Sequence, residues 1–316
     1  MKSHTTRRTL ALFVGLTSLA AATLGLATAA QAASKKTTAK STKGFPLTVK
    51  DSRGPVKIAK KPVRIVSLSA SATESLFAVG AGKQVLAVDD QSNYPATAPM
   101  TKLSGFTPNV EAIVAYKPDL VVISNDIKDL AAGLTKLKIP VLLLPAANTI
   151  DEAYSQIEVI GAATGHLADS AILVSRMRAD ISKLTEKVAK RAKPVTFYHE
   201  LDDTFYSVTS KTFIGSIYSL AGLTNIADAA DKDAGGYPQL TNEYIVAQNP
   251  DLIFLADTKC CKQSAQSVGA RPGWGELSAV KRSQVIALDD DIASRWGPRI
   301  VDQFRAIVEA TTKVAV

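Results

Sequence analysis

The chain has 316 residues and a formal net charge of +8 at neutral pH. The basic excess lies at its beginning, because residues 65–316 hold 24 basic and 28 acidic residues. A slightly acidic body without a basic stripe interleaved with aromatic residues argues against a nucleic-acid-binding protein. The length is sufficient for two lobes, each with a core of its own.

Residues 1–32 have the pattern of a secretory signal peptide. Arg7 and Arg8 precede a long apolar run, and a small-residue cleavage motif ends at Ala32. A membrane anchor is the alternative for a run of this length, and the arginine pair has a weak likeness to a twin-arginine export signal. We therefore expect an exported protein, periplasmic or at the cell surface, that begins near Ala33.

Residues 33–61 are rich in lysine and small polar residues, which predicts a tether and N-terminal segment ahead of the folded body. From residue 62 to residue 148, short apolar runs alternate with segments of helical periodicity. The predicted strands are 64–69, 84–90, 119–124 and 140–145, and the predicted helices include 71–82 and 128–139. Such alternation is typical of a parallel α/β lobe.

Residues 149–193 form the predicted linking region. A helix over 149–165 ends at Gly165, and residues 166–193 then contain neither proline nor glycine. An unbroken helix over somewhat more than twenty of these residues spans about 35 Å, at 1.5 Å per residue. The alternation of strands and helices restarts at 194 and continues to 316, which predicts a second α/β lobe.

One ten-residue pattern occurs in both lobes. Residues 111–120 (EAIVAYKPDL) and 243–252 (EYIVAQNPDL) share seven identities. In each copy, Pro-Asp is expected to end a helix and begin a buried strand. The repeat predicts two similar Rossmann-like lobes joined by one long rigid helix, with a ligand cleft between them.

The motifs of common secreted enzymes are absent from the sequence. It contains no G-x-S-x-G nucleophile elbow, no P-loop and no G-x-G-x-x-G after a strand. The predicted mature chain has only His166 and His199, fewer than a zinc or manganese receptor usually needs. We expect a monomeric binding protein without metal or cofactor, and an enzyme of two-lobed α/β architecture is the alternative.

Aromatic and polar residues recur at predicted strand ends and in loops. These are Ser69, Ser71, Tyr94, Phe106, His199, Phe205, Tyr206, Tyr237, Arg295 and Trp296. Aromatic side chains exposed in loops are costly unless they bind something. Each one alone could equally be a half-buried packing residue, but together they predict a wide cleft for a large ligand with apolar faces.

The two cysteines, Cys260 and Cys261, are adjacent. Thiols of exported proteins tend to oxidise, so we expect a vicinal disulfide that stiffens a loop. Pairing between molecules and a redox or soft-metal site are the alternatives.

Several stretches resemble one family in order along both lobes. They are RIVSLSASATESLFAVGAG, SNYP, NVEAIVAYKPDLV, GYPQLTNEYIVAQNPDLI and RWGPRIVDQF. With them the chain resembles the helical-backbone substrate-binding proteins of ABC importers for cobalamin and ferric siderophores, and it is nearest to the cobalamin-binding members. The resemblance implies a receptor that performs no chemistry and delivers a corrinoid or a ferric siderophore to a membrane permease.

The resemblance also implies roles for single residues. Tyr94 matches a ligand-stacking tyrosine, Phe106 and Tyr237 stand where the family has tryptophans, and Arg295 matches a ligand-proximal arginine. Phe205 or Tyr206 falls near a phenylalanine of the cleft, and Trp296 would add an aromatic wall. Glu111 and Glu243 fall on two acidic positions that each meet an arginine of the permease, although a glutamate in a first turn also offsets the helix dipole.

Three ligand classes remain open. A corrinoid would be bound by stacking and shape. A ferric siderophore would need cationic side chains for its oxygen donors, and the candidates are Lys211, Arg271, Arg295 and Arg299. Heme, the third class, would use Tyr94, His199 or Tyr206 on the iron.

Overall fold

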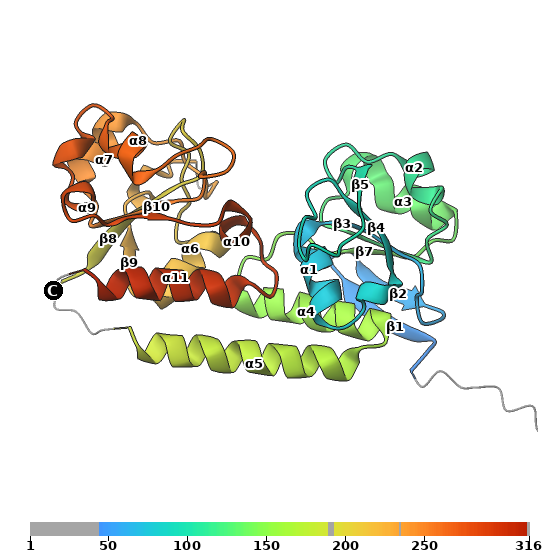
Figure 1. The fold of residues 1–316 in the computed structure, drawn as a ribbon. Coiled ribbons are helices and arrows are strands. Elements are labelled where there is room, and N and C mark those ends of the chain that lie inside the picture. Colours follow the sequence, from blue (N-terminus) through green and yellow to red (C-terminus); the bar gives the residue numbers. More distant parts are fainter. Residues whose placement is uncertain (1–43, 189–192, 234, 315–316) are drawn as a thin grey trace, which may run out of the picture. The chain divides into compact units, whose positions relative to one another are not determined.

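The structure is a computed structural model that describes residues 44–188, 193–233 and 235–314. The predicted signal peptide, and the tether as far as residue 43, lie outside the described residues. Figure 1 shows two sheet-bearing lobes together with the long helices α4, α5 and α11. Within the described residues, no helix is both long and apolar enough to span a bilayer.

The first lobe is built on a five-stranded parallel sheet with the order β5-β4-β3-β6-β7. Its strands are β3 (Ile65–Leu68), β4 (Val85–Asp89), β5 (Met100–Leu103), β6 (Leu120–Ile123) and β7 (Val141–Leu143). Its helices are α1 (Ala70–Ala78), α2 (Val110–Val114) and α3 (Leu130–Lys136). The central strands β3 and β6 are buried at every position, as expected for strands covered on both faces.

A hairpin precedes this lobe, within the predicted tether and N-terminal segment. It consists of β1 (Leu47–Asp51) and β2 (Gly54–Ile58), paired antiparallel. The Asp51 carboxylate accepts a hydrogen bond from the backbone N–H of Leu143 at 2.9 Å, and Arg53 donates to the carbonyl of Val141 at 2.7 Å. The hairpin is therefore fastened to β7, and it forms part of the N-terminal segment that the sequence predicts after the lysine-rich tether.

Two helices follow the first lobe. Helix α4 (Ile150–Thr164) ends at Gly165, whose φ of +75° closes the helix, and α5 (Leu167–Glu186) begins after His166. Helix α5 has 20 residues and spans about 30 Å. It ends earlier than predicted, and residues 189–192 lie outside the described parts. Helix α5 packs against both α4 and α11 and runs beneath both lobes in Figure 1, where the long linking helix was predicted.

The second lobe is built on a four-stranded parallel sheet with the order β11-β10-β8-β9. Its strands are β8 (Val195–Glu200), β9 (Leu223–Asn225), β10 (Leu252–Leu255) and β11 (Val285–Ala287). Its helices are α6 (Phe213–Leu220), α7 (Asn242–Gln248), α8 (Ala265–Gly269), α9 (Ser278–Lys281), α10 (Asp290–Ser294) and α11 (Ile300–Thr312).

The two lobes share one topology. The order β4-β3-β6-β7 in the first corresponds to β9-β8-β10-β11 in the second, and β5 is an addition at the edge of the first sheet. The repeated pattern forms α2 and β6 in one lobe and α7 and β10 in the other. Lys117 and Asn249, at equivalent positions after these helices, both have left-handed backbones, with φ of 52° and 45°. The prediction of two similar α/β lobes is confirmed.

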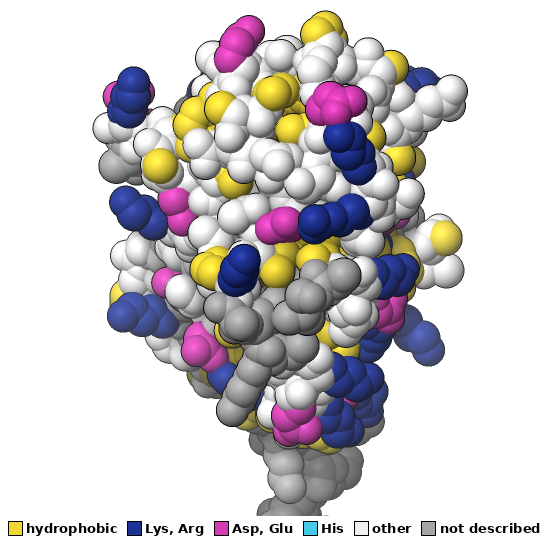
Figure 2. Space-filling view, turned by 90° about the vertical axis from the view of Figure 1, so that its left-hand side faces the viewer, with side chains coloured by type: hydrophobic (Ala, Val, Ile, Leu, Met, Phe, Trp, Pro, Cys, Tyr) yellow, Lys and Arg dark blue, Asp and Glu magenta, His cyan; other side chains and the backbone are white. Residues whose placement is uncertain are grey.

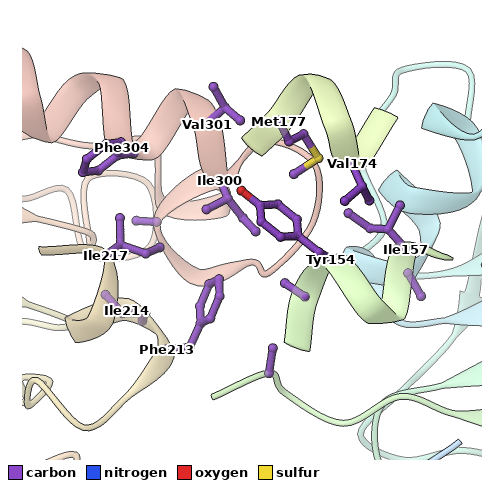
Figure 3. Close-up of a cluster of buried hydrophobic side chains, with 14 of the residues drawn as sticks. Tyr154, Ile157, Val174, Met177, Phe213, Ile214, Ile217, Ile300, Val301 and Phe304 are labelled. Carbon is purple, nitrogen blue, oxygen red and sulfur yellow. The ribbon is translucent and has the colours of Figure 1, made fainter. Parts of the chain in front are cut away.

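An apolar core runs from the first lobe through the helices into the second. It contains residues of both sheets as well as of the helices between them. Figure 3 shows side chains of α4, α5, α6 and α11 gathered in one cluster. The labelled members are Tyr154, Ile157, Val174, Met177, Phe213, Ile214, Ile217, Ile300, Val301 and Phe304. The two lobes and the helices between them therefore share one close-packed interior.

Candidate ligand-binding site

Exposed aromatic side chains occur in loops that follow strands in both lobes. The strands of each lobe's main sheet are parallel, so their carboxyl ends meet at one edge, where α/β proteins bind ligands. Four aromatic side chains are exposed in the described parts of the chain: Tyr94 (46%), Phe106 (67%), Tyr206 (40%) and Tyr237 (50%). They lie in the segments that follow β4, β5, β8 and β9, two in each lobe.

In the second lobe, Tyr206 and Tyr237 line one open pocket of about 740 Å³, together with Tyr244. The segments that carry the first two run side by side, because Tyr206 pairs with Gln239 in an antiparallel bridge and Ser207 donates to the carbonyl of Pro238 at 3.0 Å. Burial raises the pKa of the Tyr237 phenol, which therefore stays protonated at neutral pH. The lining of this pocket therefore includes both exposed tyrosines of the second lobe, Tyr206 and Tyr237.

The two lobes meet at a buried carboxylate, Glu74 of α1, whose side chain is 1% exposed. Arg295 Nη1 donates to Glu74 Oε1 at 2.9 Å. Arg299 donates to both carboxylate oxygens, at 3.0 Å from Nε and at 2.5 Å from Nη2. Burial opposes the charge on Arg299, but the hydrogen bond and attraction of Glu74 outweigh it and raise the pKa of the guanidinium.

Arg295 is bound on several sides. Besides Glu74, it donates to Asn93 Oδ1 and to the carbonyl of Gln91, both at 2.9 Å, and to Asp291 Oδ1 at 2.6 Å. Its side chain is only 9% exposed. The contacts of Arg295 therefore join the two lobes, and its expected role in binding a ligand stays a prediction.

Tyr94 lies against this junction. The Arg299 guanidinium is centred 4.2 Å from the Tyr94 ring, within the range of a cation–π interaction. Tyr94, Phe77, Pro298 and Arg299 belong to the lining of an open pocket of about 430 Å³ between α1 and the start of α11. Tyr94 is thus supported by a residue of the other lobe while nearly half of its surface remains exposed.

His199 was expected at the cleft, and the structure corrects this. Its side chain is fully buried, and Nδ1 lies 2.8 Å from the hydroxyl of Tyr218 on α6. Burial lowers the pKa of the imidazole to about 3, so the ring is neutral at physiological pH. Because side chains alternate along a strand, His199 faces the core with Phe197 and cannot reach a ligand.

Three further candidates are packing or capping residues. Phe205 stacks on Trp274 with ring centres 5.9 Å apart. Ser69 is buried and caps α1 by accepting from the backbone N–H of Ala72 at 3.3 Å. Trp296 is half-buried, and its indole N–H donates to Gln156 at 3.0 Å. These contacts bury Ser69 and partly bury Phe205 and Trp296, so none of the three is exposed as the four aromatic side chains named above are.

The second lobe also holds a buried polar group, in which one siderophore candidate, Arg271, meets the carboxyl groups of Glu200 and Asp257. Arg271 makes a bidentate pair with Glu200, at 2.6 and 2.7 Å, and its guanidinium lies 4.5 Å from the centre of the Trp274 ring. Asp257 follows β10 and is fully buried, and burial together with the nearby Glu200 raises the pKa of its carboxyl to about 8. No local pattern marks these residues, because their meeting depends on the pairing of β8 with β10.

The structure joins Cys260 and Cys261 in a disulfide. The loop that carries them is anchored on α10, because the backbone N–H groups of Thr258, Lys259 and Cys260 donate to Asp290 at 2.8–3.1 Å. Lys259 Nζ also lies 2.8 Å from a carboxylate oxygen of Asp291.

Glu111 and Glu243 are exposed in the first turns of α2 and α7. The helices are capped alike, by the side chains of Asn109 and Thr241. Figure 2 shows acidic and basic side chains interspersed over one face of the molecule, with no continuous basic stripe there. Within the described residues, no group of three or more His, Cys, Asp or Glu side chains is placed to hold a metal ion.

Two similar parallel lobes with exposed aromatic side chains at the carboxyl edges define a two-lobed ligand-binding protein. The chain belongs to the periplasmic binding protein family, whose model matches residues 65–292.

Named relatives agree with this assignment. A Bacillus subtilis protein named as an uncharacterized ABC transporter substrate-binding lipoprotein is 33% identical, over 85% of this chain and 86% of its own length. A cobalamin-binding protein of Halobacterium salinarum is 30% identical, over 84% of this chain and 74% of the relative. The crystal structure of a periplasmic vitamin B12 binding protein of Vibrio cholerae superposes with a TM-score of 0.65, at 26% identity, over 80% of this chain and 97% of that one.

Proposed function

We propose that this protein is an exported receptor that binds a corrinoid of the cobalamin type and delivers it to the permease of an ABC importer. The observation that carries the proposal is the position of the four exposed aromatic side chains, two at the carboxyl edge of each lobe. A corrin ring offers wide apolar faces, which Tyr94, Phe106, Tyr206 and Tyr237 can cover by stacking. The names of the Halobacterium relative and of the Vibrio structure support the same ligand class.

The cationic side chains favour a corrinoid over a ferric siderophore. Anionic oxygen donors require free cations, yet Arg295 and Arg299 are bound to Glu74 and Arg271 is bound to Glu200. Of the four candidates for siderophore recognition, Lys211 alone is exposed. Heme is disfavoured because His199 is buried, although Tyr94 and Tyr206 remain accessible as iron ligands.

In this proposal the receptor acts as a monomer and performs no chemistry. The lobe of residues 62–148 and the lobe of residues 194–316 each supply one wall of the cleft, and 149–193 link them. Glu111 and Glu243 dock on the permease, one from each lobe. The signal peptide is cleaved near Ala32, so that the receptor works outside the cytoplasm.

The test is retention of a coloured ligand by the purified, ligand-free protein. Cyanocobalamin, a panel of ferric siderophores and hemin are each mixed with the protein, desalted, and measured by visible absorption. We expect the corrinoid spectrum to remain with the protein at a ratio near one to one, and calorimetry to give its affinity. Retention of a ferric siderophore or of hemin, with loss of cyanocobalamin, would overturn the corrinoid assignment.

A further inference from the structure

We infer that Arg299 is a positioning residue for the ligand site: through its contacts with Glu74 and Tyr94 it sets the orientation of Tyr94 from the opposite lobe. The inference rests on the proposed function for the role of Tyr94 in binding. The inference also states that contacts from the second lobe hold the loop that carries Tyr94. This statement does not depend on the proposed function, because it is drawn from the contacts alone.

The first element is the anchor beneath Arg299. Glu74 is buried in α1 and accepts from two of the guanidinium nitrogens of Arg299 and from one of Arg295. A bidentate guanidinium–carboxylate pair has a fixed plane, unlike a single contact to a flexible lysine. The plane of Arg299 is therefore determined by a residue of the first lobe, although Arg299 itself immediately precedes α11 of the second.

The second element is the stacking contact. The Arg299 guanidinium is centred 4.2 Å from the Tyr94 ring, and Tyr94 keeps 46% of its surface exposed. A guanidinium that covers part of an aromatic ring favours one ring orientation and leaves the remaining surface for a ligand. Arg299 thus affects ligand binding by orienting Tyr94, and it does not touch the ligand itself.

The third element is the backbone of the Tyr94 loop, residues 90–99. Two positions just before Tyr94 are held from the second lobe: Arg295 donates to the carbonyl of Gln91, and both Arg295 and Asp291 bond to the side chain of Asn93. Three second-lobe side chains consequently hold residues 91, 93 and 94 of the first lobe. A change in the spacing of the lobes must move Tyr94 or break these contacts.

The binding test is a double-mutant cycle with cyanocobalamin as the probe. We expect Arg299→Met to weaken binding about tenfold, in the range of coupling between contacting residues. In the Tyr94→Ala background the same change should add less than twofold, because the residue through which Arg299 acts is already absent. Arg299→Lys should recover part of the loss, since it keeps a cation near the ring. Equal effects of Arg299→Met in both backgrounds would overturn the inference.

Arg178 offers a control for the cation–π contact. Its guanidinium lies 4.4 Å from the centre of the Tyr154 ring and makes a single, exposed ion pair with Asp151 at 2.7 Å, away from the carboxyl edges. Arg178→Met should leave cyanocobalamin affinity within twofold of the wild type. A loss equal to that of Arg299→Met would show a general effect of removing such a contact and would overturn the inference.

A ligand-free measurement separates this inference from the proposed function. In hydrogen–deuterium exchange, Arg299→Met and Arg295→Met should each speed exchange of the amides in residues 90–99, whereas Arg178→Met should not. Unchanged exchange in that loop overturns the positioning role, whatever ligand the protein binds. If the wild type binds no cyanocobalamin, the corrinoid proposal fails, and faster loop exchange still supports the positioning of Tyr94.

Discussion

Asp119 and Asp251 occupy equivalent positions in the two lobes, and each fastens its helix–turn–strand unit to the central strand of its sheet. The Asp119 carboxylate accepts from the backbone N–H groups of Val63 and Arg64, at 2.8–3.2 Å, just before β3. The Asp251 carboxylate accepts from the N–H of Thr196 at 3.0 Å, at the start of β8. The Pro-Asp of the repeated pattern is therefore a structural clamp in both lobes.

Loss of either clamp should lower global stability. We expect Asp119→Ala and Asp251→Ala each to reduce the free energy of unfolding by about 1–2 kcal/mol, because backbone donors lose a charged acceptor. Urea denaturation of the two variants measures the effect. Asp302→Ala is the control, since it removes an exposed carboxylate paired only with Arg305 at 2.8 Å on a helix surface. Equal midpoints for all three variants would contradict the clamp.

The exposed tyrosines should carry much of the affinity for the ligand. Tyr94→Ala and Tyr237→Ala should each weaken cyanocobalamin binding by about 1–3 kcal/mol, as expected for the loss of a stacked aromatic contact, with unchanged far-UV circular dichroism. Calorimetry measures the affinities. Tyr94→Phe and Tyr237→Phe keep the rings and should bind nearly as well as the wild type. Loss of binding in a Phe variant would instead indicate that the hydroxyl is needed, as for an iron ligand.

Two acidic residues, one in each lobe, should support docking on the permease. Glu111→Arg combined with Glu243→Arg should leave ligand affinity unchanged and abolish both docking and uptake, and each single change should weaken docking in part. The effect should be larger at low salt, where charge pairing is strongest. Glu158→Arg combined with Glu309→Arg, at exposed positions on α4 and α11, serves as the control. Normal uptake by the Glu111/Glu243 variant would leave these residues only a helix-dipole role.

The cysteine pair should be oxidised in the exported protein. Thiol titration of native, unreduced protein should find no free thiol, and non-reducing gels should show a monomer. Reduction should change the urea midpoint little, because a disulfide between adjacent residues closes almost no loop. Two titratable thiols, or a dimer that disappears with reductant, would contradict an intramolecular pair of Cys260 and Cys261.

Asp257 should make stability depend on pH. Burial, and then the charge of Glu200, raise the pKa of its carboxyl from 3.8 to about 8 in the folded protein. Between these values the unfolded chain is ionised at this position while the folded chain keeps its proton. The contribution of Asp257 to the free energy of unfolding is therefore fully present below about pH 4, and it declines as the pH rises towards 8.

Asp257→Asn removes that titration. The difference in unfolding free energy between the variant and the wild type should shift in favour of the variant by about 3–4 kcal/mol from pH 5 to pH 8. Urea denaturation at several pH values measures this difference. A difference that stays constant over the range would show that Asp257 titrates normally in the fold.

The sequence alone determined the parallel α/β lobes and their repetition. Apolar runs, glycine and proline stops and the repeated Pro-Asp act over a few residues, so their pattern predicts β3, β4, β6 and α4 within a residue or two of their observed bounds. The sequence pattern did not predict β1, β2, β5 and β9, which are short strands at sheet edges or in the hairpin. Such strands are stabilised by their neighbours more than by a pattern of their own.

The tertiary structure alone decided which candidate residues face solvent. His199 and Tyr206 are seven residues apart, yet one lies within a sheet against Tyr218 and the other lines an open pocket. Glu74 meets Arg295 across 221 residues of sequence, and no local signal links them. Local periodicity depends on near neighbours along the chain, whereas burial and ion pairing depend on how distant segments pack. For that reason the sequence could predict the lobes, and only the packing of one lobe on the other could show that Arg295 joins them.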